Sequence, residues 1–152
     1  MENRFLIMNS QSLVDIVNYT KDLLKAHPEV EIHIGCDSQN YKNHTVYVTT
    51  IVYRYPKNGA RVLYKKEKVK KINDMWTKLW GELERSIQLA LFIEQSTGVK
   101  VKQIDLDYNE DPSFASNKLL QAASGYVTSM GFNASSKPNL LMATWAANVL
   151  CH

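Results

Sequence analysis

The pattern of apolar and polar positions divides the chain into stretches with two different periods. Residues 10–28, SQSLVDIVNYTKDLLKAHP, carry apolar side chains at helical spacing after a serine and end at Pro28, which predicts an amphipathic helix. Residues 30–38, VEIHIGCDS, alternate instead, with Cys36 on one face and Asp37 on the other. This alternation predicts the first strand of a sheet.

Two more strands are predicted directly after the first one. Residues 44–55, HTVYVTTIVYRY, are rich in β-branched and aromatic side chains, which favour strands. Pro56, Asn58 and Gly59 then indicate a turn, and residues 60–70, ARVLYKKEKVK, return as a third strand. The three strands form an antiparallel meander.

The second half of the chain changes to a helical period and back. Residues 73–96 carry a wide apolar stripe, Gly98 ends that helix, and residues 99–109 read as a fourth strand. A strand reached through a helical crossover runs parallel to its neighbour. The remaining elements are a helix over 112–130, a short strand over 131–136 and a last helix over 137–152. The order predicts a single α/β domain over residues 1–152, with a mixed five-stranded sheet flanked by helices.

Composition is that of an ordinary soluble globular protein. The chain has 152 residues, of which 45% are hydrophobic and 22% charged. The apolar run in MENRFLIMNS is too short for a signal peptide, and LLMATWAANVL is too short to span a bilayer. Two cysteines, Cys36 and Cys151, form neither a disulfide framework nor a metal-ligand spacing. We therefore expect a cytoplasmic protein with reduced thiols and no membrane partner.

Positive charge is concentrated in one segment. Residues 54–71 hold eight of the 18 basic residues and one acid, so they carry +7, leaving −4 for the rest of a chain whose total is +3. A basic ribbon on a slightly acidic body is typical of a protein that meets a nucleic acid on one side. The residues expected to contact phosphates are Arg61, Lys65, Lys66, Lys68 and Lys70. The alternative is a solvated edge strand that its lysines protect from aggregation.

Three acidic positions are notable for where they fall in these elements. Asp37 ends the first predicted strand, and Asp107 ends the fourth. The long helix between them carries Glu82 and Glu84, about 200° apart on the helical wheel, so the two cannot serve one site together. The wheel places Glu84 at the edge of the apolar stripe, facing the sheet, and Glu82 slightly farther out at the opposite edge. We therefore choose Glu84, with Glu82 as the substitute.

Clustered carboxylates without basic partners are unfavourable unless cations neutralise them. Carboxylate oxygens suit hard divalent ions, so Mg²⁺ or Mn²⁺ at Asp37, Glu84 and Asp107 would explain the cluster and support phosphodiester hydrolysis. The alternative is that Asp37 caps the loop it enters through backbone amides. Asp105 is expected to be a solvated or supporting acid, and His33 a hydrogen-bonded core histidine.

The segments IGCDSQ, LWGELERSIQLA, IDLDYNED and KPNLLMATWAANVL occur in that order along nearly the whole chain. Together with the element order, they resemble the YkuK-type ribonuclease-H-like family. The resemblance implies a ribonuclease H fold in which the metal-binding carboxylates are Asp37, Glu84 and Asp107. The polar neighbours that it implies are Ser38, Gln39 and Asn109.

One departure from the family pattern lies in the last helix. Ribonuclease-H-like sites usually supply a fourth carboxylate there, whereas this chain offers Asn148 and has no acid after Asp111. An amide adds no negative charge, so a second metal ion would be held weakly.

Two functions therefore follow from the sequence. The first is a Mg²⁺- or Mn²⁺-dependent nuclease acting on a nucleic acid. The alternative is a non-catalytic nucleic-acid-binding or structural module that reuses the fold with a decayed metal site. Whether the chain is an enzyme, whether the partner is DNA or RNA, and whether it forms homo-oligomers or binds other proteins stay open.

Overall fold

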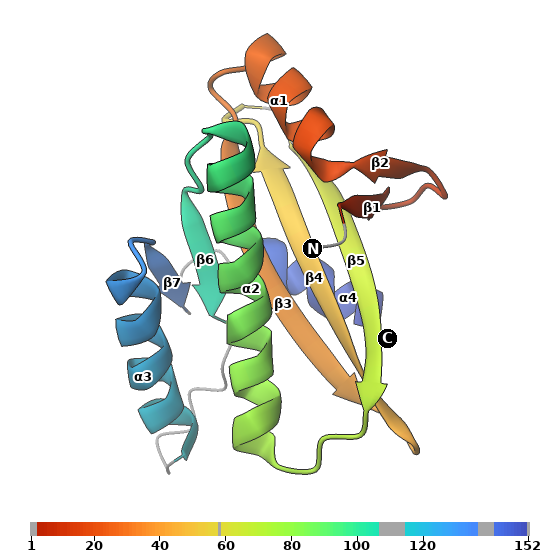
Figure 1. Ribbon diagram of the computed structural model, residues 1–152, viewed down its shortest axis with the longest axis vertical. Helices are drawn as coiled ribbons and strands as arrows, with labels where there is room; N and C mark the ends of the chain where they lie inside the picture. The colour runs from red at the N-terminus through yellow and green to blue at the C-terminus, as the bar shows by residue number, and fades with distance from the viewer. Residues whose placement is uncertain (1–2, 58, 107–114, 137–141, 152) are drawn as a thin grey trace.

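A computed structural model describes residues 3–57, 59–106, 115–136 and 142–151, and it contains one sheet of seven strands in the order β2-β1-β5-β4-β3-β6-β7 (Figure 1). The strands are β1 (Arg4–Ile7), β2 (Leu13–Asp15), β3 (Glu31–Asn40), β4 (His44–Arg54), β5 (Ala60–Lys70), β6 (Gln103–Leu106) and β7 (Ala134–Ser136). The helices are α1 (Ile16–Ala26), α2 (Met75–Thr97), α3 (Ala115–Ser129) and α4 (Met142–Cys151).

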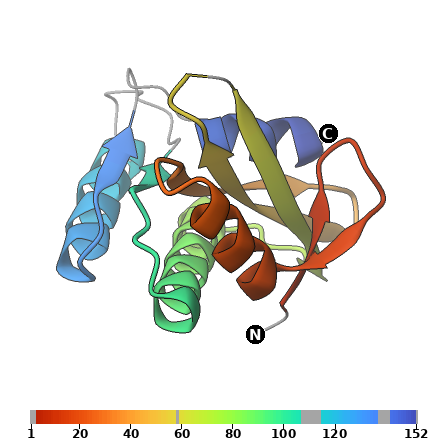
Figure 2. The ribbon, with the colours of Figure 1, turned by 90° about the horizontal axis from the view of Figure 1, so that it is seen from above.

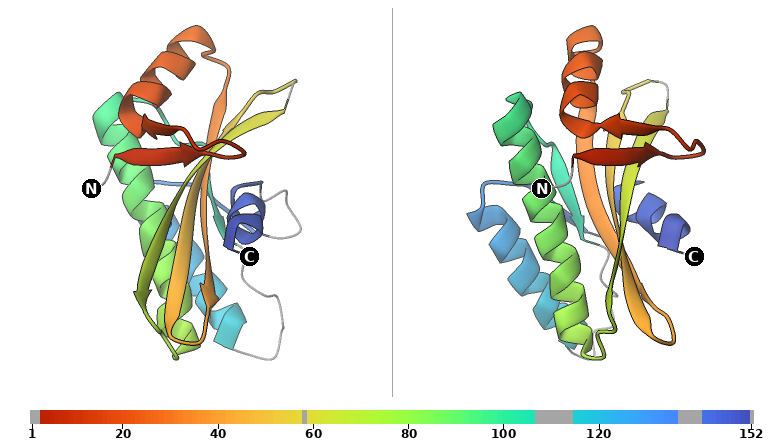
Figure 3. Two further views of the ribbon diagram at one scale, coloured as in Figure 1. Left: turned by 90° about the vertical axis from the view of Figure 1, so that its right-hand side faces the viewer. Right: turned by 45° about the vertical axis from the view of Figure 1, so that its right-hand side comes forward.

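The helices lie on both faces of this sheet. Helix α2 crosses one face with α1 and α3 beside it, while α4 packs on the opposite face against β3 and β4 (Figure 3). Seen from above, α3 and β7 lie at one side of the molecule and the β1–β2 hairpin at the other (Figure 2). The two faces of β3 are therefore covered by different helices, α2 and α4.

The predicted meander of β3, β4 and β5 is confirmed. Strands β3 and β4 pair antiparallel from Glu31↔Arg54 to Asn40↔Thr45, and β4 and β5 pair over their whole length. Strand β6 pairs parallel with β3, as a helical crossover requires, and β7 pairs parallel with β6. The mixed α/β sheet is thus as the sequence predicts in its central part.

The predicted number of strands is wrong: the sheet has seven strands, whereas the sequence predicts five. The two extra strands, β1 and β2, form an antiparallel hairpin whose turn holds Asn9 at a left-handed φ of 65°. The helix predicted from residue 10 begins only at Ile16, where Asp15 caps it by accepting hydrogen bonds from two backbone amides. Strands of three or four residues give too little alternation to separate them from the start of a helix.

The main hydrophobic core lies between the sheet and the helices α1 and α2. Ile34, Ile51, Leu83 and Ile87 are all buried in it. Helix α2 ends at Gly98, whose φ of 72° is the left-handed conformation that favours glycine at a helix end, as the sequence predicts. The core therefore fixes α2 firmly against one face of β3 and β4.

None of the helices within the described ranges is long and apolar enough to cross a membrane. Helix α4 is apolar but has only 10 residues, so it is about 15 Å long against a hydrocarbon core of about 30 Å. Helix α2 has 23 residues but is interrupted by charged side chains.

Candidate functional site

Asp37 lies within β3 rather than at its end, which corrects the prediction. The strand continues to Asn40 because β4 pairs with it over that whole length. On the other edge of β3, the parallel ladder with β6 pairs Ile34 with Ile104 and goes no further among the described residues. Asp37 is therefore paired with β4 on one side of its strand. On the other side it lies beyond the last described pair of the β3–β6 ladder.

Helix α4 reaches Asp37 because Gly35 lets it approach the sheet closely. A Cβ at Gly35 would lie 2.8 Å from the backbone nitrogen of Thr144, closer than two such atoms can pack. The hydroxyl of Thr50 donates to the carbonyl of Ala143 over 2.7 Å and fixes the same end of the helix. The result is that Nδ2 of Asn148 donates a hydrogen bond to Oδ2 of Asp37 over 2.9 Å.

A second carboxylate, Glu82, is held on the opposite face of β3. Its side chain is buried, with 6% exposed, and accepts a hydrogen bond from the hydroxyl of Ser38. The Nζ atom of Lys78, one turn earlier on α2, donates to the carbonyl of Ser38 over 3.2 Å. Ser38 directly follows Asp37 in β3. Polar side chains of α2 therefore contact Ser38 on one face of the sheet, while Asn148 of α4 contacts Asp37 on the other face.

The predicted orientation of Glu84 is wrong. Glu84 is exposed on the outer surface of α2, whereas Glu82 is buried against β3 in line with Ser86 and Leu89. The helical wheel failed because the buried face of α2 includes polar Glu82 and Ser86, so its centre is displaced from that of the apolar stripe. The named substitute, Glu82, thus takes the place expected of Glu84.

The carboxylates of Asp37 and Glu82 both influence the pKa of the Cys151 thiol. The pKa of this buried thiol is raised to about 12, first by burial and then by the negative charges of Asp37 and Glu82. The charges of Lys66 and Lys78 act in the opposite direction. Both carboxylates therefore act on one thiol at the end of α4, although they approach β3 from different faces.

Two further polar residues are buried on the α4 side of the sheet. Asp105 is 3% exposed and accepts hydrogen bonds from the backbone of Ala143 and from Gln103, so of the two expected roles, a solvated or a supporting acid, the solvated one is wrong. Burial raises the pKa of Asp105, and these hydrogen bonds offset part of the rise. The core histidine His33 is buried as expected, but only Nε2 has a partner, Glu31, among the described residues.

The remaining predicted site residues are only partly placed. Gln39 lies two residues beyond Asp37 on β3 and therefore on the same face of the sheet, with its side chain reaching the carbonyl of Asn40. Asp107 and Asn109 lie outside the described residues. Within the described part of the chain, no group of three or more acidic, histidine or cysteine side chains is close enough to hold a metal ion.

The five predicted phosphate-contacting residues do not share one surface. Lys66 pairs in register with Val48, whose other neighbour is Asp37, so Lys66 and Asp37 face the α4 side together. Lys68 and Lys70 follow on that same side, and all three lysines are exposed. In contrast, Arg61 and Lys65 face α1 and α2 because successive side chains of a strand alternate. We call Lys66, Lys68 and Lys70 the lysine row.

Sequence reasoning missed Lys78, Cys151 and the close packing at Gly35. Lys78 lies outside the basic segment, and only the tertiary contact of α2 with β3 brings it to Ser38. Gly35 offered a signal, since a glycine within a strand indicates a close approach of backbone or ligand.

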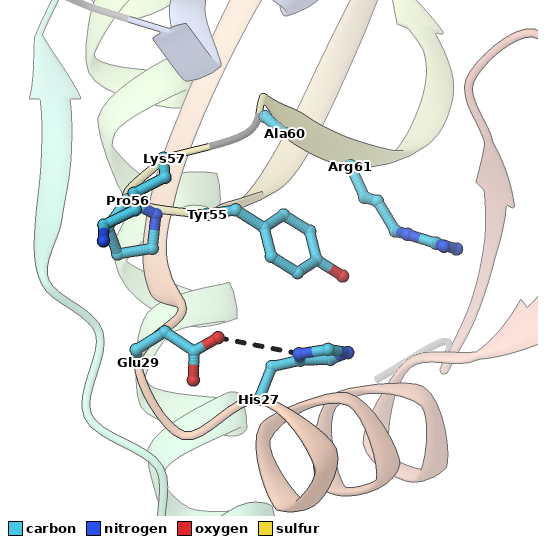
Figure 4. Close-up of a pocket in the computed structure, with 7 residues that line it drawn as sticks. All are labelled: His27, Glu29, Tyr55, Pro56, Lys57, Ala60 and Arg61. Carbon is cyan, nitrogen blue, oxygen red and sulfur yellow. Dashed lines mark ion pairs between the residues drawn. The ribbon is translucent and has the colours of Figure 1, made fainter.

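A cavity of about 740 Å³ lies at the other end of the sheet from Asp37 (Figure 4). It is formed where β3 begins and where β4 turns into β5, and Figure 4 shows Tyr55 and Arg61 reaching over it. Nδ1 of His27 lies 3.6 Å from a carboxylate oxygen of Glu29 at its lower wall. None of the predicted site carboxylates lines it.

A mixed sheet whose antiparallel meander is followed by parallel strands, with helices on both faces, defines an α/β protein. The family model described as ribonuclease H-like matches residues 11–151, and the chain belongs to that family. The family resemblance stated from the sequence is thereby confirmed.

Other comparisons add little to the family assignment. No curated protein matches the chain. Among solved structures, the chain is similar to the crystal structure of RNase H1 from the halophilic archaeon Halobacterium salinarum NRC-1. The two share 13% identity at a TM-score of 0.40, covering 76% of this chain and 87% of that one.

Proposed function

We propose that this protein is a divalent-metal-dependent nuclease that hydrolyses phosphodiester bonds of a nucleic acid at Asp37, on the edge of β3 where the described ladder with β6 has ended. The observation that carries the proposal is the position of Asp37, which lies next to Asn148 of α4 and directly before Ser38, the partner of Glu82. Membership of the ribonuclease H-like family supports a nuclease or nucleic-acid-binding protein. In this proposal Glu82 replaces Glu84 as the helix carboxylate.

The donor types at this edge fit a hard cation. Asp37 and Glu82 offer carboxylate oxygens, which suit Mg²⁺ or Mn²⁺, and we propose Asp107 as the third ligand. A bound divalent ion would neutralise these acids and stabilise the charge that develops on the phosphodiester oxygens. Ser38 would hold Glu82 in place by its hydrogen bond, and Asn148 would orient Asp37 in the same way.

The lysine row would hold the nucleic-acid backbone. Lys66 and Asp37 stand on the same face with only β4 between their strands, which separates them by about 10 Å. A phosphate chain that crosses this face would therefore contact lysines a short distance before or after the bond at Asp37. Arg61 and Lys65 face the other side and take no part.

A second function, a non-catalytic nucleic-acid-binding module, is favoured by one contact. Asn148 donates its amide proton to Oδ2 of Asp37, an oxygen that a metal ion would otherwise use. An amide also leaves the site one negative charge short of a fourth carboxylate. In this alternative the lysine row binds nucleic acid and no divalent ion is needed.

Calorimetry with Mn²⁺, together with cleavage of labelled DNA, RNA and hybrid duplexes, tests the nuclease against the binding module. The wild type should bind one ion, and Asn148→Asp should raise metal affinity and speed cleavage because it adds a ligand charge. Asp37→Asn should abolish cleavage, whereas Asp22→Asn, which removes an exposed acid from α1, should leave it unchanged. If wild type and Asn148→Asp bind no ion and cut none of these substrates, the nuclease proposal fails and the binding module takes its place.

A further inference from the structure

A cavity of about 410 Å³ on the outer side of α2 has no role in the proposed cleavage site. Three of its nine lining residues are aromatic, and Glu84 and Arg85 are the two charged residues among them. The remaining lining residues include Tyr47, Trp76 and Trp80. An aromatic cavity with a few convergent polar groups is typical of a site for a planar organic ligand.

The aromatic walls come from two turns of α2 and from its neighbours. Trp76 and Trp80 are four residues apart and therefore lie on the same side of the helix. Trp80 also packs against Tyr126 of α3, with ring centroids 5.6 Å apart, which fixes its ring. Trp76 is 43% exposed, so a large part of its surface is open to a ligand. Exposed indole rings are effective stacking surfaces for nucleobases.

The two charged residues present opposite hydrogen-bonding character. Glu84 has no hydrogen-bond or ion-pair partner within the described ranges, so its carboxylate oxygens can accept hydrogen bonds from a ligand. Arg85 lies 3.7 Å from the ring centre of Tyr47, and its Nε donates to Glu67 over 2.8 Å while Nη1 donates to Gly81. The guanidinium is therefore held in place at the cavity wall, and its Nη2 has no hydrogen-bond partner among the described residues.

We propose that this cavity binds a guanine base of the nucleic acid. Guanine offers two adjacent donors, N1–H and the 2-amino group, to the carboxylate of Glu84, and its O6 and N7 acceptors match an arginine. Adenine carries an acceptor at N1, which would face the carboxylate of Glu84 unfavourably. A positively charged ligand fits less well, because Arg85 already places a positive charge in the wall.

This inference extends the proposed function by naming a base that its nucleic-acid substrate would contain. The base site lies on the outer side of α2, and Glu82 of the proposed cleavage site lies on the side that faces β3. Base binding can therefore be measured without divalent ions and without cleavage. A protein that cuts nothing would still test it.

The test is calorimetry of the full chain with GMP, IMP and AMP in a metal-free buffer. GMP should bind about tenfold more tightly than AMP, with IMP between them because it keeps N1–H but lacks the 2-amino group. Glu84→Gln, an exposed and isosteric change, should remove this preference, whereas Glu29→Gln in the other large cavity should retain it. The phosphate is common to the three nucleotides, so the difference reports the base.

The tryptophan resonances locate the ligand, and the binding preferences decide the outcome. The indole N–H resonances of Trp76 and Trp80 should shift on adding GMP, while that of Trp145, which is on α4, should not. Equal binding of GMP and AMP, or a preference that survives in Glu84→Gln, would overturn the proposal. Competition by methylguanidinium as strong as that by GMP would also overturn it, because the cavity would then be a cation site.

Discussion

Replacing Gly35 with alanine should destabilise the protein by pushing α4 away from β3. The new Cβ would lie 2.8 Å from the nitrogen and 2.9 Å from the Cγ2 of Thr144, and 3.0 Å from the carbonyl carbon of Ala143. These separations fall about 0.5–0.7 Å short of the optimum near 3.5 Å. Two of the three atoms belong to the backbone of α4, so the helix itself must move.

The size of the effect follows from two opposing terms. Overpacking of this kind costs about 1–3 kcal/mol, while replacing a strand glycine by alanine returns about 0.5–1 kcal/mol of backbone entropy. The clash prevails, and we expect a net loss of about 1–2 kcal/mol in the free energy of unfolding. The same shift should draw Asn148 away from Asp37, so metal affinity at the site should change as well.

Urea unfolding followed by circular dichroism measures this loss. Gly125→Ala is the matched control, because Gly125 lies within α3 and a Cβ there meets no atom within 4 Å. In that helix the same substitution should stabilise the protein by about 0.5–1 kcal/mol. If Gly35→Ala proves as stable as the wild type while Gly125→Ala behaves as expected, the close packing of α4 on β3 is refuted.

Two other predictions concern the lysine row and Asp105. Replacing Lys66 and Lys68 with alanine should weaken nucleic-acid binding and reduce the slope of log affinity against log salt by about 1 per lysine, while Arg61→Ala on the other face should not change the slope. Fluorescence anisotropy over a salt series measures this, and a wild-type slope after replacement of the two lysines would exclude the row as the interface. Because burial raises the pKa of Asp105 above its ordinary 3.8, the stability linked to its proton is present below that pH and is lost as the pH rises through the raised pKa. Urea midpoints of Asp105→Asn relative to wild type should therefore increase as the pH rises across this window, and a constant difference would show that Asp105 titrates alike in both states.

The sequence pattern predicts those helices and strands in which the alternation of apolar and polar residues continues over many positions. The alternation over residues 60–70 predicts β5 over the residues it occupies, and the apolar stripe predicts α2 to within two residues at its start and one at its end. The β1–β2 hairpin was missed because its strands have four and three residues, too few to show a period. The family pattern similarly drew attention to Asp37 and Asn148, whose contact the fold provides.

Which side chains share a surface depends on how the elements pack in three dimensions. Whether Glu82 or Glu84 faces β3 depends on the rotation of α2 about its own axis. The apolar stripe does not define this rotation closely enough to choose between two residues at its opposite edges. The division of the basic segment between two faces followed from the pleat of β5 and from the helices that cover each face. Sequence periodicity predicts the local conformation of a segment because that conformation depends on residues close in sequence. Long-range packing determines how each helix or strand is rotated about its axis and how closely it approaches its neighbours. The groups near Asp37 therefore come from segments that are distant in sequence. Their contact depends on Gly35, which lacks a side chain and so lets α4 pack closely on β3.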